Sequence, residues 1–509
     1  MVVLDGESLR LGDVVAVARG FQTASLGETG RRRIAAGWAV VERVLASETP
    51  VYGISTGFGE FSKVFISRPQ RLKLQRNLVL SHAAAVGEYL PEDAVRAIML
   101  LRANSLAKGY SGVRPETVEK LLELLNKKVY PAIPAKGSVG ASGDLAPLAH
   151  LALVLMGEGE AFAGGRMVSG AEALAASGIA PFILGGKEGL ALINGTQVMT
   201  GIGVLTWHDA ANLMKVADIA AAMSLEALRG TRTAFDRRIA AVRAHPGQLA
   251  TSSNILNLTA GSAIIASHAD CSKVQDAYSL RCVPQVHGAS KDAVRHVREV
   301  LEAEINAATD NPLVFPETGE VLSGGNFHGQ PVALAMDYLK LAVAEIGSIS
   351  ERRTSRMLDT HLSELPPFLT AYPGIDSGLM ITQYTAAALV SENKVLAHPA
   401  CVDSIPTSAN QEDHVSMGTI AARQSREILE NVRHVLAIEL LAAAQGIDFL
   451  HPLTPGVGTA AVHSAIRRAV PHLDEDRVPA PDIRRVCQMI ADGTLVDAAE
   501  QAAGPLQPF

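Results

Sequence analysis

The 509-residue chain has few aromatic residues, few charges and few cysteines. Only 4% of its residues are aromatic and 19% are charged, against about 25% charged in an average soluble domain. Because 48% of the chain is hydrophobic, the composition excludes intrinsic disorder, which requires low hydrophobicity and high net charge. Apolar residues other than aromatics suit closely packed helices. The shortage of charge predicts a large surface buried against other subunits, and therefore an oligomer.

Basic clusters and cysteine pairs are also missing. The net charge is −7, and the densest basic runs, residues 31–33 and 352–353, are too short to follow a phosphate backbone, so nucleic acid is not an expected partner. The four cysteines form no CxxC pair and have no histidine at zinc spacing, so no metal is expected. Four thiols in a chain of this length favour a reducing compartment over a disulfide framework.

Long hydrophobic runs are absent as well. The most apolar stretches, residues 145–156 and 189–207, are respectively too short and too rich in Gly, Asn, Thr and Gln to span a bilayer. The first residues lack the basic head and apolar core of a signal peptide. We therefore expect a cytoplasmic protein without a membrane partner. Since the glycine-rich segments fit no phosphate loop, no nucleotide cofactor is expected.

Helical periodicity dominates what is present. A helix is expected at residues 115–127, with proline at its first position and the pair Lys127-Lys128 at its close. Longer helices are expected at about 195–229, 289–308, 329–361, 376–397 and 412–445. Small β-hairpins are expected at 162–168 and 313–322, turning at Gly-Gly and Thr-Gly pairs. The fold class is mainly α, a bundle of long helices with small β-hairpins.

The most informative segment is GSVGASGDLAPLAH, residues 137–150. As plain structure it is a loop of small residues in which Asp144 caps the helix that follows. That interpretation leaves the minimal side chains of Ala141, Ser142 and Gly143 unexplained. A sharp bend would let the Gly143 nitrogen attack the Ala141 carbonyl and close a five-membered ring, because glycine is the least hindered residue. Loss of water from Ser142 would then leave 4-methylidene-imidazole-5-one, an electrophile made from the chain itself.

This segment resembles the prosthetic-group motif of the aromatic amino-acid ammonia-lyases and aminomutases. Further blocks resemble the family in the family's order: YGISTGFG (52–59), NGTQ (194–197), QDAYSLR (275–281), GNFHG (325–329) and NQEDH (410–414). One Ala-Ser-Gly tripeptide recurs by chance, whereas five further blocks in order do not. The resemblance implies an aspartase/fumarase-like helical architecture and the ring electrophile as the prosthetic group. It also implies a homotetramer whose active sites are shared between subunits.

Two positions indicate the substrate. Ser81-His82 is similar to the pair in histidine-selective members, whereas phenylalanine-selective members tend to have an apolar pair and tyrosine-selective members a His-Leu pair. Glu412 is an acid that phenylalanine enzymes usually lack. An imidazole requires a hydrogen-bonding partner, while a phenyl ring requires a dry apolar slot. The resemblance therefore implies L-histidine as substrate and trans-urocanate and ammonium as products. Phenylalanine or tyrosine ammonia-lyase or aminomutase activity is the alternative.

The resemblance also implies roles for four residues around the reacting atoms. Tyr52 is expected to remove the β-proton, which requires local positive charge or hydrogen bonds that stabilise a phenolate. Tyr278 is expected near the prosthetic group as an acid/base or hydrogen-bond partner. Arg281 would bind the substrate carboxylate through two parallel hydrogen bonds. If their segment is helical, Gln275, Tyr278 and Arg281 fall on one face, with Gln275 as a substrate-binding residue.

Two further residues and the domain division complete the expectations. Asn194 is expected to orient the substrate carboxylate or the ring carbonyl of the prosthetic group; a buried Asn that satisfies a loop backbone is the competing interpretation. Phe327 is expected to hold the ring and limit water. Residues 1–200 would form an N-terminal domain with the tyrosine and prosthetic-group loops, and residues 201–509 a long-helix bundle that mediates oligomerisation.

Two other classes remain as alternatives. A fumarase/aspartase-type lyase would also be a long helical bundle with composite sites, but its Gly-Ser-Ser-x-Met-Pro type of signature is absent. A non-enzymatic helical scaffold predicts no ring formation at Ser142, and it leaves the clustered glycine loops unexplained.

Overall fold

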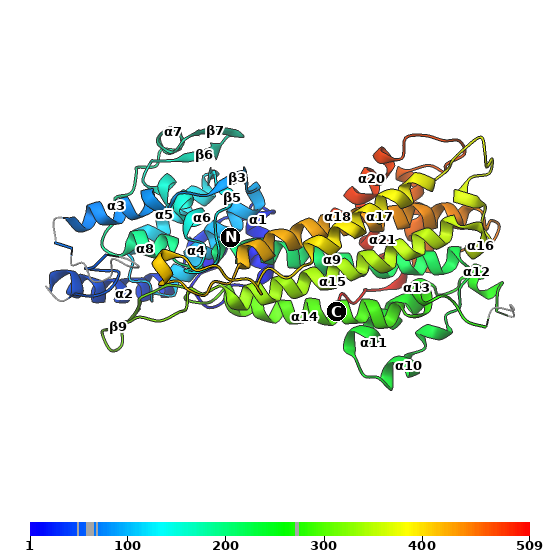
Figure 1. Ribbon diagram of the computed structural model, residues 1–509, viewed down its shortest axis with the longest axis horizontal. Coiled ribbons are helices and arrows are strands. Elements are labelled where there is room, and N and C mark those ends of the chain that lie inside the picture. Colours follow the sequence, from blue (N-terminus) through cyan, green and yellow to red (C-terminus); the bar gives the residue numbers. More distant parts are fainter. Residues whose placement is uncertain (48–49, 58–65, 68–69, 270–273) are drawn as a thin grey trace. The chain divides into compact units, whose positions relative to one another are not determined.

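The structure is a computed structural model that describes residues 1–47, 50–57, 66–67, 70–269 and 274–509. These residues form two compact units (Figure 1). Unit 1 comprises residues 1–205, 298–337 and 399–423, and unit 2 comprises residues 206–297, 338–398 and 424–509. Helices make up most of the described chain, which confirms the mainly α fold class. Within the described ranges, no helix combines the length and the apolarity needed to cross a membrane.

Unit 1 is built around a buried helix. Its helices are α1 (Leu11–Ala18), α2 (Glu28–Ala46), α3 (Arg71–His82), α4 (Glu92–Ala107), α5 (Pro115–Asn126), α6 (Leu145–Leu155), α7 (Gly170–Ala176) and α8 (Glu188–Ile193). Every residue of α4 from Ala94 to Ala107 is buried, which is typical of a helix surrounded by others. Helices α1 and α5 pack on α4, and α3, α6 and α8 pack on one another (Figure 1).

Short strands flank these helices. β1 (Val2–Leu4) pairs in parallel with β2 (Ala24–Leu26), and β3 (Val86–Tyr89) pairs antiparallel with β5 (Pro134–Lys136). The first expected hairpin forms β6 (Glu160–Ala163) and β7 (Arg166–Ser169), and β4 (Val129–Pro131) adds a third strand that the sequence did not indicate. Its turn residues Gly164 and Gly165 have φ values of 58° and 76°, the left-handed region that such a turn requires. The second expected hairpin forms β8 (Leu313–Phe315) and β9 (Glu320–Leu322).

The expected long helices are present, with shifted ends. They are α9 (Gln197–Ala227), α14 (Val283–Glu304), α15 (Gln330–Leu358), α17 (Met380–Leu396) and α18 (Gly418–Asp448). Helix α18 begins at Gly418, not near residue 412, because Met417 lies in the left-handed region at φ 55° and breaks the helical backbone. Ser408, Ala409 and Asn410 are left-handed as well. Residues 408–417 are therefore a loop.

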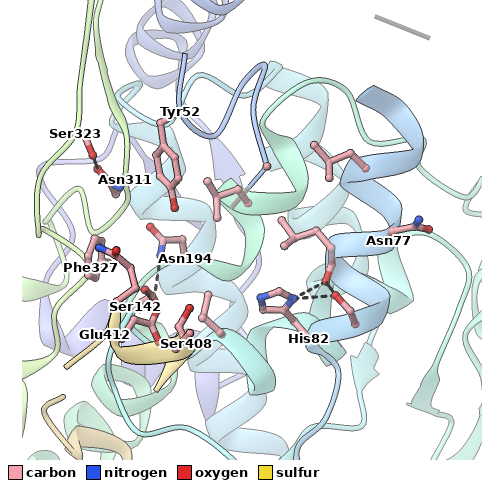
Figure 2. Close-up of a pocket in the computed structure, with 18 of the residues that line it drawn as sticks. Tyr52, Asn77, His82, Ser142, Asn194, Asn311, Ser323, Phe327, Ser408 and Glu412 are labelled. Carbon is pink, nitrogen blue, oxygen red and sulfur yellow. Dashed lines mark hydrogen bonds between the residues drawn. The ribbon is translucent and has the colours of Figure 1, made fainter. Parts of the chain in front are cut away.

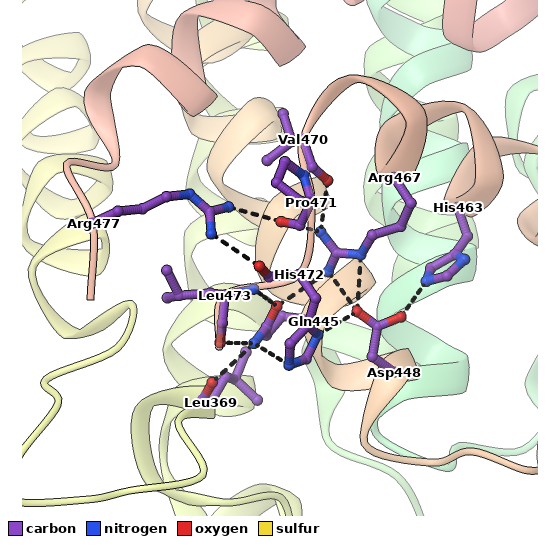
Figure 3. Close-up of polar contacts among 10 residues, drawn as sticks. All are labelled: Leu369, Gln445, Asp448, His463, Arg467, Val470, Pro471, His472, Leu473 and Arg477. Carbon is purple, nitrogen blue, oxygen red and sulfur yellow. Dashed lines mark hydrogen bonds and ion pairs between the residues drawn. The ribbon is translucent and has the colours of Figure 1, made fainter. Parts of the chain in front are cut away.

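Unit 2 contains a polar cluster centred on Asp448, at the end of α18 (Figure 3). The further helices of unit 2 are α10 (Arg237–Ala241), α11 (Pro246–Leu258), α12 (Ala263–Ala266), α13 (Tyr278–Arg281), α16 (Thr360–Ser363), α19 (Val457–Ala469), α20 (Ala480–Ala491) and α21 (Thr494–Ala503). Ring nitrogens of His463 and His472 lie 2.7 and 2.8 Å from the Asp448 carboxylate, and Arg467 Nε donates to it at 2.8 Å. Burial alone would raise the pKa of Asp448, but these partners lower it to about 2. The cluster ties the segment after α19 to α18.

Candidate active site

Six of the residues expected to have a catalytic or substrate-binding role line one cavity of about 1100 Å³ in unit 1 (Figure 2). They are Tyr52, His82, Ser142, Asn194, Phe327 and Glu412. Each comes from a different segment: the loop after α2, the end of α3, the loop before α6, the end of α8, the loop after β9 and the loop before α18. The cavity therefore gathers all of the sequence blocks that belong to unit 1.

The loop that holds Ser142 is shaped by close backbone contact. Gly143 has a φ of +72°, and a Cβ built there would lie 2.1 Å from the Gly195 carbonyl oxygen. Position 143 therefore requires glycine for both its angle and its space. On the other side of Ser142, Ala141 is buried in an apolar cluster with Val415 and Met417. The minimal side chains of this loop are thus explained by what packs against them.

Ser142 is held by two polar side chains of the cavity (Figure 2). Its Oγ donates to Glu412 Oε1 at 2.7 Å, and Asn194 Nδ2 donates to its carbonyl oxygen at 3.1 Å. Glu412 is itself held by Thr407, whose Oγ1 donates to Glu412 Oε2 at 2.8 Å. Asn194 Oδ1 is buried and has no hydrogen-bond partner among the described residues. The hydroxyl and the carbonyl group of Ser142 are therefore each held by a hydrogen bond.

Asp144 occupies the N-cap position of α6, but its side chain caps a different helix. It makes no capping bond to α6; Oδ2 accepts from the backbone N–H groups of Val198 and Met199, both at 2.9 Å, in the first turn of α9. Oδ1 accepts from the hydroxyls of Ser138, at 2.9 Å, and Thr419. Burial raises the pKa of this carboxyl, and these donors oppose the shift. The expectation that Asp144 caps its own helix is wrong, because the start of α9 offers unpaired N–H groups nearby.

His82 presents one ring nitrogen to the cavity. Its Nδ1 lies 2.8 Å from the Leu78 carbonyl oxygen and 3.1 Å from Ser81 Oγ. A carbonyl can only accept, so Nδ1 carries the proton and Nε2 of the neutral ring is an acceptor. Burial lowers the pKa of His82, although the Leu78 carbonyl and the Glu412 charge oppose it. Near neutral pH, His82 therefore offers Nε2, which points into the cavity (Figure 2), to an N–H donor.

Tyr52 and Phe327 form other parts of the wall. The Tyr52 loop is anchored by Ile54, which is fully buried with Val40 and Val41 of α2. The Tyr52 hydroxyl points toward Asn194 (Figure 2). Phe327 is half-buried and presents an apolar surface to the cavity. Phe58 and Gly59, the last two residues of the expected tyrosine loop, lie outside the described residues.

Three expected site residues lie in unit 2 and do not line this cavity. Tyr278 and Arg281 are on the short helix α13, and Gln275 precedes it, so the expected single helical face does not include Gln275. Helix α13 starts only at Tyr278, after a non-helical stretch. Tyr278 is 70% exposed, and the Arg281 guanidinium stacks on its ring at 4.5 Å. Arg281 Nε is buried without a hydrogen-bond partner among the described residues.

The sequence argument missed several polar residues of the cavity. They are Asn77, Asn311, Ser323 and Ser408. Asn311 Oδ1 accepts from Ser323 Oγ at 3.1 Å and from the Gly324 N–H at 2.7 Å, so it fixes the loop that leads to Phe327. The Asn-Pro pair at 311–312 was the available signal, because this dipeptide is typical of a turn. No group of three potential metal ligands occurs among the residues that the structure describes.

Comparison with known proteins places the whole chain beside one group of enzymes. The model of the family "Aromatic amino acid lyase" matches residues 9–468. A histidine ammonia-lyase of Alkaliphilus oremlandii is 57% identical over 501 residues, which cover 98% of this chain and 99% of the relative. That of Gloeobacter violaceus is 56% identical over 506 residues, covering 99% and 98%.

Comparison with solved structures leads to the same group of enzymes. The crystal structure of histidine ammonia-lyase from Trypanosoma cruzi has a TM-score of 0.92 at 43% identity and covers 98% of this chain and 95% of its own. The tyrosine aminomutase of Streptomyces globisporus has a TM-score of 0.94 at 39% identity, covering 99% of both chains. These likenesses confirm the aspartase/fumarase-like helical architecture.

Proposed function

The chain belongs to the aromatic amino acid lyase family, and we propose that it eliminates ammonia from L-histidine to give trans-urocanate, the first step of histidine degradation. The observation that carries the substrate choice is the presence of His82 and Glu412 in the same cavity as Ser142. His82 Nε2 accepts from a ring N–H, and the Glu412 carboxylate attracts a partly positive imidazole. A phenyl ring would leave His82 Nε2 without a hydrogen-bond donor, which is unfavourable in a half-buried site.

Ala141, Ser142 and Gly143 are proposed to form 4-methylidene-imidazole-5-one, without any metal or nucleotide cofactor. The site fits the group. Asn194 already donates to the Ser142 carbonyl, which becomes the ring carbonyl, and Gly143 lies in a bend that only glycine accommodates. The Ser142 hydroxyl, which must leave as water, is held by Glu412. Once formed, the ring would supply an electrophilic carbon for the substrate, toward its amine in the route that we favour, and would so make ammonia a better leaving group.

The residues of the chain would share the remaining tasks. We propose that Tyr52 takes the β-proton of the substrate, since its hydroxyl points into the cavity toward Asn194. Asn194 keeps the ring carbonyl in place, and Phe327 limits the water that reaches it. His82 and Glu412 hold the imidazole. Loss of ammonia from the α-carbon and of the proton from the β-carbon leaves the double bond of urocanate.

The described residues that line the cavity include no lysine or arginine that could bind a carboxylate, and we propose that other subunits of a homotetramer supply this group. Arg281 Nε has no hydrogen-bond partner among the residues that the structure describes, and Tyr278 is exposed beside it, so both could contact another subunit. Gln275 would accompany them. The low charge of the chain is consistent with extensive subunit contact. We further propose the cytoplasm as location, because Cys282 and Cys487 form no disulfide.

Product analysis tests the reaction. The purified protein is incubated with L-histidine, L-phenylalanine and L-tyrosine, and urocanate, cinnamate, coumarate and β-amino acids are quantified. We expect urocanate from histidine alone. A cinnamate- or coumarate-forming enzyme would contradict the substrate assignment. Formation of β-histidine would indicate an aminomutase, the activity named for the structural neighbour from Streptomyces globisporus.

Intact mass tests the prosthetic group. Cyclisation and dehydration each release one water, so the mature chain should be lighter than the encoded chain by two waters. Ser142→Ala removes the hydroxyl that leaves, and therefore prevents the dehydration and the activity together. A fully active protein at its encoded mass would contradict the proposed prosthetic group.

Mixing two inactive variants tests the sharing of sites. In tetramers mixed from Ser142→Ala and Arg281→Ala chains, some sites would combine the intact Ser142 of one chain with the intact Arg281 of another, so activity should return. Tyr52→Phe with Ser142→Ala is the matched control: these two residues line the same cavity of one chain, so no mixed site contains both intact. Equal behaviour of the two pairs would argue against shared sites.

A further inference from the structure

A fully buried arginine lies directly behind the cavity wall. Arg102, in the middle of α4, is 0% exposed. Its Nη1 donates to the Asn194 carbonyl oxygen and to Gln197 Oε1, both at 2.8 Å, and its Nη2 lies 3.4 Å from Ser105 Oγ. Gln197 Nε2 in turn donates to Thr309 Oγ1 at 2.7 Å. The guanidinium therefore joins the end of α8, the start of α9 and the segment after α14.

This charge is held by neutral oxygens. None of the described carboxylates forms an ion pair with Arg102, and the nearby Asp310 is bound to Lys187 at 2.7 Å, with both of these side chains 0% exposed. Burial lowers the pKa of Arg102 to about 10, so the group stays charged near neutral pH. Burying a cation without a carboxylate is unfavourable unless its hydrogen bonds are strong. Bonds from a charged donor to a carbonyl are among the strong ones.

The peptide that receives this bond is the one that carries Asn194. The neighbouring Gly195 leaves the guanidinium just enough room, since a Cβ there would lie 2.5 Å from Arg102 Nη1. The Gly195 carbonyl accepts from the Asp144 N–H at 2.7 Å, so the next peptide along the chain touches the Ser142 loop. Asn194 Nδ2 donates to the Ser142 carbonyl oxygen at 3.1 Å, so a series of hydrogen bonds leads from Arg102 to Ser142. A shift of the Asn194 backbone would therefore move the only described donor to that carbonyl.

We propose that Arg102 is a positioning residue: by holding the Asn194 carbonyl, it sets the Asn194 amide against the Ser142 carbonyl and so promotes both formation and correct placement of the prosthetic group. This role rests on the proposed function. It acts on Ser142 through Asn194 and involves no contact with substrate. Removing the guanidinium leaves the Asn194 peptide free to shift, and misplacement of a catalytic group by about 1 Å can lower the rate about a hundredfold.

Arg102→Met is the informative change, because it keeps the stem and removes the donors. Arg96→Met is the matched control. Arg96 lies on the same helix, is 2% exposed, and donates to the carbonyls of Val17 and Ala18 and to the Tyr130 hydroxyl, none of which line the cavity. Both variants lose a buried guanidinium, so both should unfold at lower temperature. Arg102→Lys, which keeps a charge without the fork of donors, should fall between wild type and Arg102→Met.

Intact mass and steady-state kinetics are measured for each purified protein. We expect Arg102→Met to retain a fraction of chains at the encoded mass, and kcat per mature site to fall about a hundredfold with KM nearly unchanged. Arg96→Met should be fully mature with wild-type kcat. If Arg102→Met does not fold, Arg102→Lys decides, and wild-type kcat with complete maturation would overturn the role. A wild-type protein at its encoded mass would instead contradict the prosthetic group itself.

Discussion

Gly143→Ala is the change whose effect the structure defines most sharply. An alanine at φ +72° is strained by about 1–2 kcal/mol, because L-residues avoid the left-handed region. Its Cβ would also lie 2.1 Å from the oxygen, 2.3 Å from the carbon and 2.8 Å from the Cα of Gly195, so backbone must move. Forcing atoms into a packed interior adds about 1–3 kcal/mol. The free energy of unfolding should therefore fall by about 2–5 kcal/mol.

Gly178→Ala provides the control for the backbone term. Gly178 has a φ of +62°, but a Cβ there meets nothing within 4 Å. Only the strain of about 1–2 kcal/mol applies to it. The difference between the two variants in thermal unfolding midpoint then reports the clash with Gly195 alone.

Maturation gives a second, independent readout. Gly143→Ala both displaces the loop and hinders the nitrogen that must attack the Ala141 carbonyl, so intact mass should show the encoded mass for most chains. Gly178→Ala should be lighter by two waters, like wild type. If the two alanine variants unfold at the same temperature and mature equally, the close approach of Gly143 to Gly195 does not shape the site.

Three further perturbations give distinct outcomes. His82→Leu removes the acceptor for an imidazole N–H and leaves Glu412 in place. It should lower kcat/KM for histidine, measured as urocanate formation, about tenfold or more, because a buried polar group without a partner costs about 1–3 kcal/mol. An unchanged kcat/KM would exclude His82 from substrate binding. Asn194→Ala should reproduce the Arg102→Met phenotype, incomplete maturation with lower kcat, and complete maturation by intact mass would contradict the role of its amide. The Asp448 pKa of about 2 lies below its ordinary 3.8, so this carboxylate stabilises unit 2 at neutral pH, and the contribution is lost as the pH falls from about 4 toward 2. Asp448→Asn should lower the free energy of unfolding by about 2 kcal/mol at pH 7 and by little at pH 2. Thermal unfolding of both proteins across this pH range checks the expectation. A difference in stability between variant and wild type that does not change with pH would argue against the linkage.

Much of this molecule follows from local sequence alone. Helical periodicity and proline and glycine at helix ends located the long helices, with ends shifted by up to six residues, because these signals act through neighbouring backbone atoms. The Gly-Gly hairpin turn at 164–165 and the small residues around Ser142 were readable for the same reason. The chemical blocks were recognised as ordered motifs, and each block that lies in unit 1 contributes at least one residue to the lining of one cavity.

Other features depend on which distant segments meet, and no local signal carries that information. Asp144 reads as the cap of α6, yet it caps α9, because the two helix starts converge in the folded chain. Residues 412–417 were expected to begin a long helix, but the left-handed backbone of Met417 delays its start to Gly418.

Arg102 is the clearest case of this dependence on tertiary structure. In the sequence it is one charge in an apolar helix; in the structure its guanidinium holds the peptide of Asn194. Sequence determines which backbone each segment prefers, since that preference is set over a few residues. Tertiary packing alone decides which buried donor finds which acceptor, because that pairing joins residues far apart in the chain.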